Sequence, residues 1–156
     1  MNTHIFREYD IRGVVPRDLT PELVTCLGRA LGTFFIRNGA RTMVLGRDCR
    51  LSSPDVHAQL VCGLVATGMQ VIDIGVCHTP LVYFSLFHLE QNAGVMITGS
   101  HNPPDCNGFK VCLGKTTIYG EQIQQIRDSM ERADFEIGSG ACEKRDMLPD
   151  YCDCIA

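Results

Sequence analysis

The chain has 156 residues, which suits one domain, since single domains commonly hold roughly 100–150 residues. It is 45% hydrophobic and 21% charged, as is ordinary for a globular protein, and its formal net charge of -4 argues against a general nucleic-acid binder. No apolar run reaches the about 20 residues that span a bilayer, and the N-terminus lacks the pattern of a signal peptide. We therefore expect a cytoplasmic protein with neither a nucleic-acid nor a membrane partner.

The cysteine content indicates a reducing environment rather than a disulfide framework. The chain has nine cysteines, an odd number at irregular spacing. Several lie inside apolar segments, where a thiol behaves as a small hydrophobic side chain. A zinc site would need Cys or His pairs at C-x2-4-C spacing, and Cys152 and Cys154 are too close together for that. We expect no zinc site.

Helical patterns alternate with short apolar runs along most of the chain. We expect the segment before Thr20 to be extended. The elements predicted after it, in chain order, are a helix around 23–34, a strand at 42–46, a helix around 56–64, a strand at 69–74, a helix at 81–89, strands at 93–97 and 107–113, and a helix at 119–132. Three hydroxyl-proline pairs predict helix starts with a hydroxyl N-cap: Thr20-Pro21, Ser53-Pro54 and Thr79-Pro80.

This alternation predicts a three-layer α/β/α domain with a small, mostly parallel mixed sheet. The strand at 107–113 follows the strand at 93–97 too closely for a helical crossover. We therefore expect it to run antiparallel, at one edge of the sheet. Residues 1–134 are predicted to form the domain. Beyond Asp134 the pattern fades, and residues 135–156 are interpreted as a linker or truncated tail.

The richest candidate site is the segment Thr98–Pro104, which follows the third apolar strand. In open α/β sheets, ligands bind outside the carboxyl ends of the strands. The segment holds Ser100 beside a histidine and an asparagine, in a turn set by Gly99 and two prolines. The residues alone also fit a well-capped turn without chemistry. A serine hydrolase would need G-x-S-x-G, which Asn102 breaks, and no nucleotide-binding signature is present.

Five motifs in order are similar to those of the α-D-phosphohexomutases. The serine segment matches that family's T-x-S-H-N-P loop, and the opening FREYDIRG resembles its phosphomannomutase/phosphoglucomutase group more than its phosphoglucosamine mutases. The whole match runs from about Ile5 to Arg132. Its five motifs are YDIRG at 9–13, GRDCR at 46–50, GVCHTP at 75–80, TGSHNP at 98–103 and NGFK at 107–110.

The resemblance implies a fold, a reaction and a set of site residues. Such enzymes move a phosphate between O1 and O6 of a hexose phosphate through phosphoserine and a bisphosphorylated sugar. By resemblance, Ser100 carries the phosphate, and Lys110 and Arg12 flank it as catalytic and substrate-binding cations. His101 helps to orient the phosphate or the loop, and Tyr9 contacts sugar or phosphate. The phosphate on Ser100 would also supply one ligand to Mg²⁺.

The same resemblance implies partners that this chain lacks. The substrate would be mannose or glucose phosphate, with the 1,6-bisphosphate as activator. Further C-terminal domains of the same enzyme would supply the Asp-rich metal loop, the sugar-specificity loop and a phosphate-binding domain. We therefore expect the chain alone to be inactive. A non-catalytic binding domain that has kept the motif is the alternative.

Other expectations concern residues outside the serine segment. Arg12 as a surface ion pair and Lys110 as a solubilising edge-strand residue remain alternatives. Arg47 and Asp48 are expected to pair with each other or to cap a turn. Faces left bare by missing domains predict weak self-association. The remaining histidines are interpreted as surface or packed residues: His4, His57, His78 and His88.

Overall fold

A computed structural model describes residues 2–156. Its sheet has seven strands in the order β1-β5-β4-β2-β3-β7, with β6 paired to β5. The strands are β1 (Ile11–Val14), β2 (Thr42–Arg47), β3 (Gln70–Val76), β4 (Ala93–Ile97), β5 (Cys106–Leu113), β6 (Thr116–Thr117) and β7 (Cys142–Lys144). Strands β4, β2, β3 and β7 are parallel, whereas β5 runs antiparallel to both β4 and β1.

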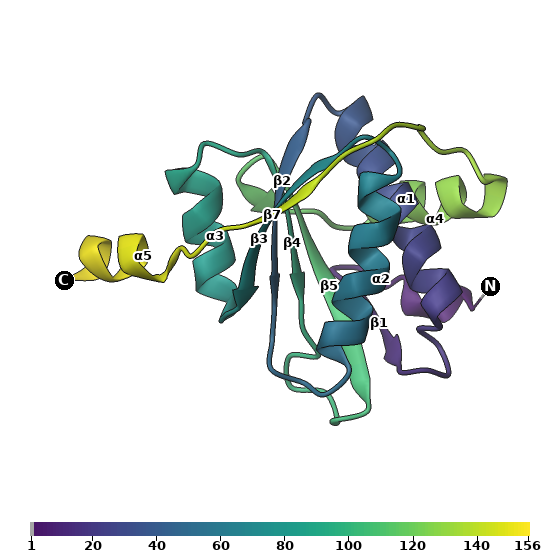
Figure 1. Cartoon of the computed structure of the whole chain (residues 1–156). Coiled ribbons are helices and arrows are strands. Elements are labelled where there is room, and N and C mark those ends of the chain that lie inside the picture. Colours follow the sequence, from purple (N-terminus) through teal and green to yellow (C-terminus); the bar gives the residue numbers. More distant parts are fainter. Residues whose placement is uncertain (1) are drawn as a thin grey trace.

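Helices cover both faces of this sheet, so the predicted three-layer α/β/α architecture is confirmed (Figure 1). A short 3-10 turn, Thr3–Ile5, precedes the α-helices α1 (Pro21–Arg37), α2 (Ser53–Val65), α3 (Thr79–His88), α4 (Glu121–Arg132) and α5 (Leu148–Ile155). Apolar residues of α1, α2 and α4 form the larger core with one face of the sheet. Residues of α3 pack on the opposite face.

The strand β5 corrects one prediction. It is antiparallel to β4, as expected, but it is an interior strand, because β1 pairs with its free side. The segment before Thr20 is extended over β1, and Arg12 lies opposite Gly108 in this pair. A short strand with an exposed arginine gives a weak strand signal in sequence, so the outer neighbour of β5 was not foreseen.

The helix starts were predicted to the right place but not always to the right cap. The Thr20 side chain accepts a hydrogen bond from the Leu23 N–H, as predicted. The α2 cap is Ser52, without a side-chain cap bond, so Ser53 is already helical. The α3 cap is His78, whose Nδ1 accepts from the Leu81 N–H. An imidazole nitrogen can accept this bond as a hydroxyl does, so Thr79 is not needed as the cap.

The C-terminal segment is more than the linker that the fading pattern predicted. Its strand β7 pairs parallel with β3, and α5 follows it. All three β7 residues are exposed and α5 has no buried residue, so neither element has the apolar pattern that predicts it. Met147, between them, is fully buried against the α3 core. No helix among residues 2–156 combines the length and apolar character needed to cross a bilayer.

Candidate functional site

The candidate site lies at the carboxyl edge of the parallel strands. The serine loop, defined here as residues 98–105, connects β4 to β5, and the GRDCR segment follows from β2. Because β2 and β4 are parallel neighbours, their carboxyl ends bring these two segments together. The Asp48 N–H donates to the Ile97 carbonyl at 2.9 Å, which closes the edge between the two strands.

Ser100 has an unusual backbone conformation within this loop. Its φ is +52°, in the left-handed region that costs a non-glycine residue about 1–2 kcal/mol. Its N–H donates to Thr98 Oγ1 at 3.0 Å. The residue is exposed, and the hydrogen bonds of the loop use its backbone rather than its hydroxyl. The loop therefore presents the Ser100 hydroxyl to solvent on a fixed backbone.

Arg50 holds the serine loop in place. Its guanidinium donates to the carbonyl oxygens of Ser100 at 3.0 Å and Asn102 at 2.8 Å. It also donates to the Cys106 carbonyl at 2.9 Å. A Cβ at Gly99 would lie 2.1 Å from the Arg50 Cζ, so only glycine leaves room for this approach. One planar guanidinium thus fixes both ends of the loop.

Asp48 links the same arginine to the loop from the other side. Its carboxylate lies 3.3 Å from Arg50 Nε, and it accepts from the Gly99 N–H at 3.1 Å and from the Ser53 hydroxyl. Burial of Asp48 opposes its ionisation, but these donors outweigh burial and hold its pKa below the ordinary value. Asp48 also accepts from the Arg50 N–H and so caps a turn. It pairs with Arg50 rather than with Arg47, so of the two expected alternatives the turn cap is the one that occurs.

Arg12 and Lys110 project from one face of the sheet. Arg12 is opposite Gly108 across the antiparallel β1–β5 pair, and Lys110 is two residues further along β5. Opposite residues share a face, and diagonal neighbours of this kind lie about 7–8 Å apart. Gly108 puts no side chain between them, and its carbonyl accepts from the Thr98 N–H at 2.9 Å. Lys110 therefore lies on the strand that continues from the serine loop, and Arg12 lies on the antiparallel neighbour of that strand.

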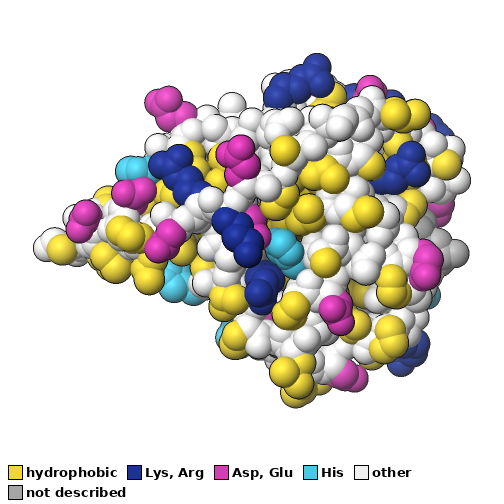
Figure 2. Space-filling view, viewed as in Figure 1, with side chains coloured by type: hydrophobic (Ala, Val, Ile, Leu, Met, Phe, Trp, Pro, Cys, Tyr) yellow, Lys and Arg dark blue, Asp and Glu magenta, His cyan; other side chains and the backbone are white. Residues whose placement is uncertain are grey.

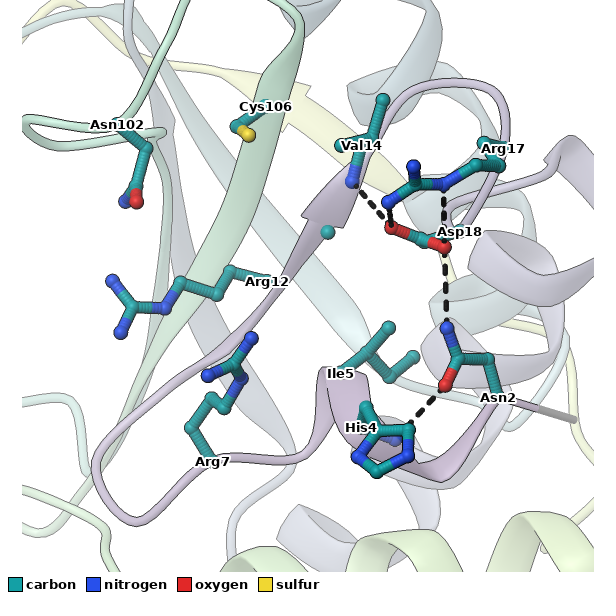
Figure 3. A pocket seen from close by; sticks show the side chains of 11 residues that line it. Asn2, His4, Ile5, Arg7, Arg12, Val14, Arg17, Asp18, Asn102 and Cys106 are labelled. Carbon is teal, nitrogen blue, oxygen red and sulfur yellow. Dashed lines mark hydrogen bonds and ion pairs between the residues drawn. The ribbon is translucent and has the colours of Figure 1, made fainter.

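A pocket of about 320 Å³ adjoins the loop and contains more positive charge than we expected (Figure 3). Arg7, Arg12 and Arg17 line it together with Asn102. Arg17 is neutralised by Asp18 at 2.9 Å, and Arg12 Nε lies 3.4 Å from Asp10. Arg7 has no carboxylate ion-pair partner among residues 2–156. The pocket can therefore accept an anion.

The remaining predicted site residues are placed less centrally. His101 is exposed in the serine loop. Tyr9 is 69% exposed, with its ring 6.4 Å from that of Tyr119, and it does not line the pocket that contains Arg12. The roles of His101 and Tyr9 therefore stay predictions that rest on the resemblance.

The described residues do not form a metal site by themselves. No group of three or more His, Cys, Asp or Glu side chains suited to a metal ion occurs within residues 2–156. Asp48, whose carboxylate accepts a hydrogen bond from the serine loop, is committed to Arg50, Ser53 and Gly99. The donor set of this chain therefore does not fit Mg²⁺ without further ligands.

Sequence reasoning missed three functional features of this site. Arg50 was recognised only as part of a motif, because carbonyl oxygens, its main acceptors, carry no sequence signal. Arg7 appeared only as part of the opening FREYDIRG. Asn102 lines the pocket, and its side-chain N–H donates to the Gly99 carbonyl at 2.8 Å. Its place in the TGSHNP motif was the available signal.

Comparisons with known proteins agree with this architecture. Residues 3–137 match the family described as phosphoglucomutase/phosphomannomutase, alpha/beta/alpha domain I. The phosphomannomutase/phosphoglucomutase of Pseudomonas aeruginosa is 48% identical over 147 residues, which cover 94% of this chain and 32% of that protein. The phosphoglucomutase of Neisseria gonorrhoeae is 40% identical over 153 residues, covering 97% of this chain and 33% of its own length.

A solved structure gives the same result for the fold. The crystal structure of a phosphoglucomutase/phosphomannomutase family protein from Burkholderia thailandensis superposes with a TM-score of 0.91 at 40% identity, covering 97% of this chain and 35% of that one. The chain thus spans about a third of the length of the relatives that it matches. This chain belongs to the phosphoglucomutase/phosphomannomutase family, and it corresponds to the α/β/α domain I of that family.

Proposed function

We propose that this chain is the phosphate-carrying domain of an enzyme that interconverts hexose 1-phosphate and hexose 6-phosphate, with Ser100 as the carrier. In the forward step, a sugar hydroxyl oxygen forms a bond to the phosphorus on Ser100. The bond from phosphorus to Ser100 Oγ breaks, and Oγ takes up a proton. In the return step, the Ser100 hydroxyl gives up its proton and Oγ forms a bond to the other phosphorus of the bisphosphorylated sugar. The bond from that phosphorus to the sugar oxygen breaks, the sugar oxygen takes up a proton, and the isomerised monophosphate leaves.

The fixed serine loop is the observation that carries this proposal. Phosphoryl transfer depends mainly on positioning and on charge stabilisation, with little other chemistry for the protein to perform. Arg50 and Asp48 hold the loop from two sides, and the Ser100 hydroxyl stays exposed. Such a loop suits a phosphate carrier, because the carrier keeps one position while the sugar binds in two orientations, one for each transfer step.

Arg12 and Lys110 supply the positive charge in this proposal. Phosphoserine carries about -1.5 to -2 charges, which need neutralisation while the phosphate moves. Lys110 lies on β5, which pairs with β4, and Arg12 lies on β1 on the other side of β5. Arg12 is in an ion pair with Asp10, and it also lines the pocket beside Asn102 of the serine loop, which favours a role at the phosphate. Lys110 in particular lies on an interior strand.

In this proposal the remaining metal ligands and the substrate-binding groups lie outside this chain. Phosphate on Ser100 would supply one oxygen to Mg²⁺, which neutralises charge on phosphate groups when bound. The remaining ligands, and the groups that select mannose or glucose, would come from the two thirds of the relatives' length that this chain does not match. A hexose 1,6-bisphosphate would load the serine.

Intact-mass spectrometry tests the carrier role directly. The chain, fused to the domains that follow in a relative, is incubated with glucose 1,6-bisphosphate and Mg²⁺, and its mass is measured. We expect the gain of one phosphate, and its loss in Ser100→Ala. The control Ser139→Ala removes another exposed hydroxyl, outside the loop, and should keep the gain. A chain that gains no phosphate, or gains it equally in Ser100→Ala, would support the non-catalytic binding domain instead.

A coupled assay tests the dependence on missing parts. We expect no turnover of glucose 1-phosphate or mannose 1-phosphate by the 156-residue chain alone. Positioning can contribute roughly 7–11 kcal/mol to such reactions, and tenfold in rate corresponds to about 1.4 kcal/mol. Fusion to domains that follow in a relative should restore turnover, and Ser100→Ala should abolish it again. Clear turnover by the chain alone would show that the sugar and metal groups lie within it.

A further inference from the structure

A second charged pocket lies along the same edge of the sheet, on the side of β3 and β7. It measures about 400 Å³, and side chains from β2, α2, β3 and the segment after β7 line it. Figure 2 shows Lys and Arg side chains gathered beside a histidine in the middle of the face toward the viewer. None of the predicted site residues lines this pocket. We call it the β7 pocket.

Three cationic side chains converge on the β7 pocket from two distant parts of the chain. Arg47 ends β2, Lys144 ends β7, and Arg145 follows it. The Arg145 N–H donates to the Asp73 carbonyl at 2.9 Å, which fixes the backbone of this residue against β3. None of the three has a carboxylate ion-pair partner among residues 2–156.

The two carboxylates that line the pocket already have other partners. Asp73 accepts from the Gly75 N–H at 2.9 Å and lies 3.2 Å from His57 Nε2, and both side chains are mostly buried. Burial of Asp73 opposes its ionisation, but His57 and the Gly75 N–H hold its pKa below the ordinary value. Asp146 accepts from the Leu148 N–H at 3.0 Å. Three cationic side chains and two carboxylates therefore leave the pocket with one positive charge in excess.

We propose that the β7 pocket binds a phosphate group of a small molecule, at a site separate from Ser100. A phosphate dianion can accept from guanidinium and ammonium donors at once, and arginine binds phosphate oxygens in pairs. The carboxyl ends of β2, β3 and β7 form the floor, which is where open α/β sheets bind ligands. Pro54, in the first turn of α2, also lines the pocket, and the positive end of a helix dipole favours an anion there.

Titration with inorganic phosphate, followed by NMR of the 15N-labelled chain at constant ionic strength, tests this site. We expect saturable shifts of the Gly75 and Arg145 amides. Arg145→Gln should weaken binding about tenfold, or about 1.4 kcal/mol, because it removes a charge-assisted hydrogen bond to the phosphate. Arg47→Gln should weaken it similarly from the opposite wall. Arg145 is exposed and Arg47 is partly exposed, and neither belongs to the core, so these substitutions leave the core intact.

Two matched controls make the outcome decisive. Arg132→Gln changes the net charge equally at the end of α4, away from the pocket, and should leave the affinity unchanged. Arg7→Gln alters the pocket beside the serine loop and should not affect the shifts of Gly75 and Arg145. Shifts that do not saturate, equal weakening by Arg132→Gln, or shifts confined to the residues around Arg7 and Asn102 would each overturn the proposal. Failure of Ser100 to take up phosphate would leave it unaffected.

Discussion

Helices and strands are usually more firmly held than loops, but the serine loop and the C-terminal segment of this chain show the opposite. The loop contains no helix or strand, yet one arginine binds three of its carbonyl oxygens, those of Ser100, Asn102 and Pro103, and Asp48 binds its Gly99 N–H. Residues 142–155 form a strand and a helix, yet among them only Met147 is buried. Local stability follows buried contacts and protected hydrogen bonds rather than secondary structure. The loop should therefore be the firmer of the two regions.

The largest effect should come from removing the Arg50 guanidinium. Arg50→Gln deprives several carbonyl groups and Asp48 of their partner, and breaking a largely buried pair costs about 3 kcal/mol. Urea unfolding of the purified chain measures this loss. Arg17→Gln is the control, because its pair with Asp18 is exposed on the arginine side and should cost less than about 1 kcal/mol. Equal losses in the two variants would mean that Arg50 does not organise the loop.

The C-terminal segment should depend on one side chain. Met147→Ala should lower the free energy of unfolding by about 2 kcal/mol, because it removes a buried thioether from the core beside α3. Leu148→Ala, one residue later and half exposed, should change it by less than about 0.5 kcal/mol. Hydrogen exchange should show β7 and α5 opening more readily in Met147→Ala. If the two substitutions had the same effect, Met147 would not be the anchor.

Acid should loosen the serine loop through Asp48. Its folded pKa lies below its unfolded value, so it stabilises the fold fully above about pH 4 and progressively less as the pH falls through the folded pKa. We expect Asp48→Asn to be less stable at pH 7 and to lose less stability between pH 5 and pH 3 than the unsubstituted chain. Urea unfolding across this range measures the slope. The same slope in Asp48→Asn and in the unsubstituted chain would assign the acid sensitivity to other carboxylates, such as Asp73.

The smallest effect concerns association of the chain with itself. Phe87 on α3 and Leu148 and Ile155 on α5 are exposed apolar side chains, and such surfaces tend to find partners. We expect weak, concentration-dependent self-association in sedimentation experiments. Leu148→Ser with Ile155→Ser should reduce it, whereas Leu51→Ser, a similar change at another exposed leucine, should not. A monomer mass independent of concentration would contradict this prediction.

Much of the fold was predictable from the sequence because its signals are local. Buried parallel strands are short apolar runs, and proline marks the starts of α1, α2 and α3, so these elements were found. The edge position of β5 was wrong because β1 adds to it across a long sequence separation. The strand β7 was missed because its residues are exposed and pair through the backbone alone.

The sequence predicted the central serine of the candidate site but not the residues that hold the serine loop in place. The TGSHNP motif located Ser100 through its resemblance to a family. Nothing in the sequence indicates that Arg50 binds backbone carbonyl oxygens of residues that lie 50 to 56 positions later in the chain. Nor does it indicate that Arg7 and Arg12 share a pocket, because this depends on how the chain turns before β1.

The interior position of β5 has a mechanical consequence for the proposed reaction. Strand β5 is hydrogen-bonded to β4 on one side and to β1 on the other, so Lys110, Arg12 and the base of the serine loop belong to one stiff hairpin platform. Moving Lys110 independently would break the ladders on both sides of β5, and moving Arg12 would break the ladder between β1 and β5. A substrate that must present first one oxygen and then another to this platform therefore has to turn over itself. In the proposed reaction the domain therefore keeps its conformation, and the sugar reorients between the two transfer steps.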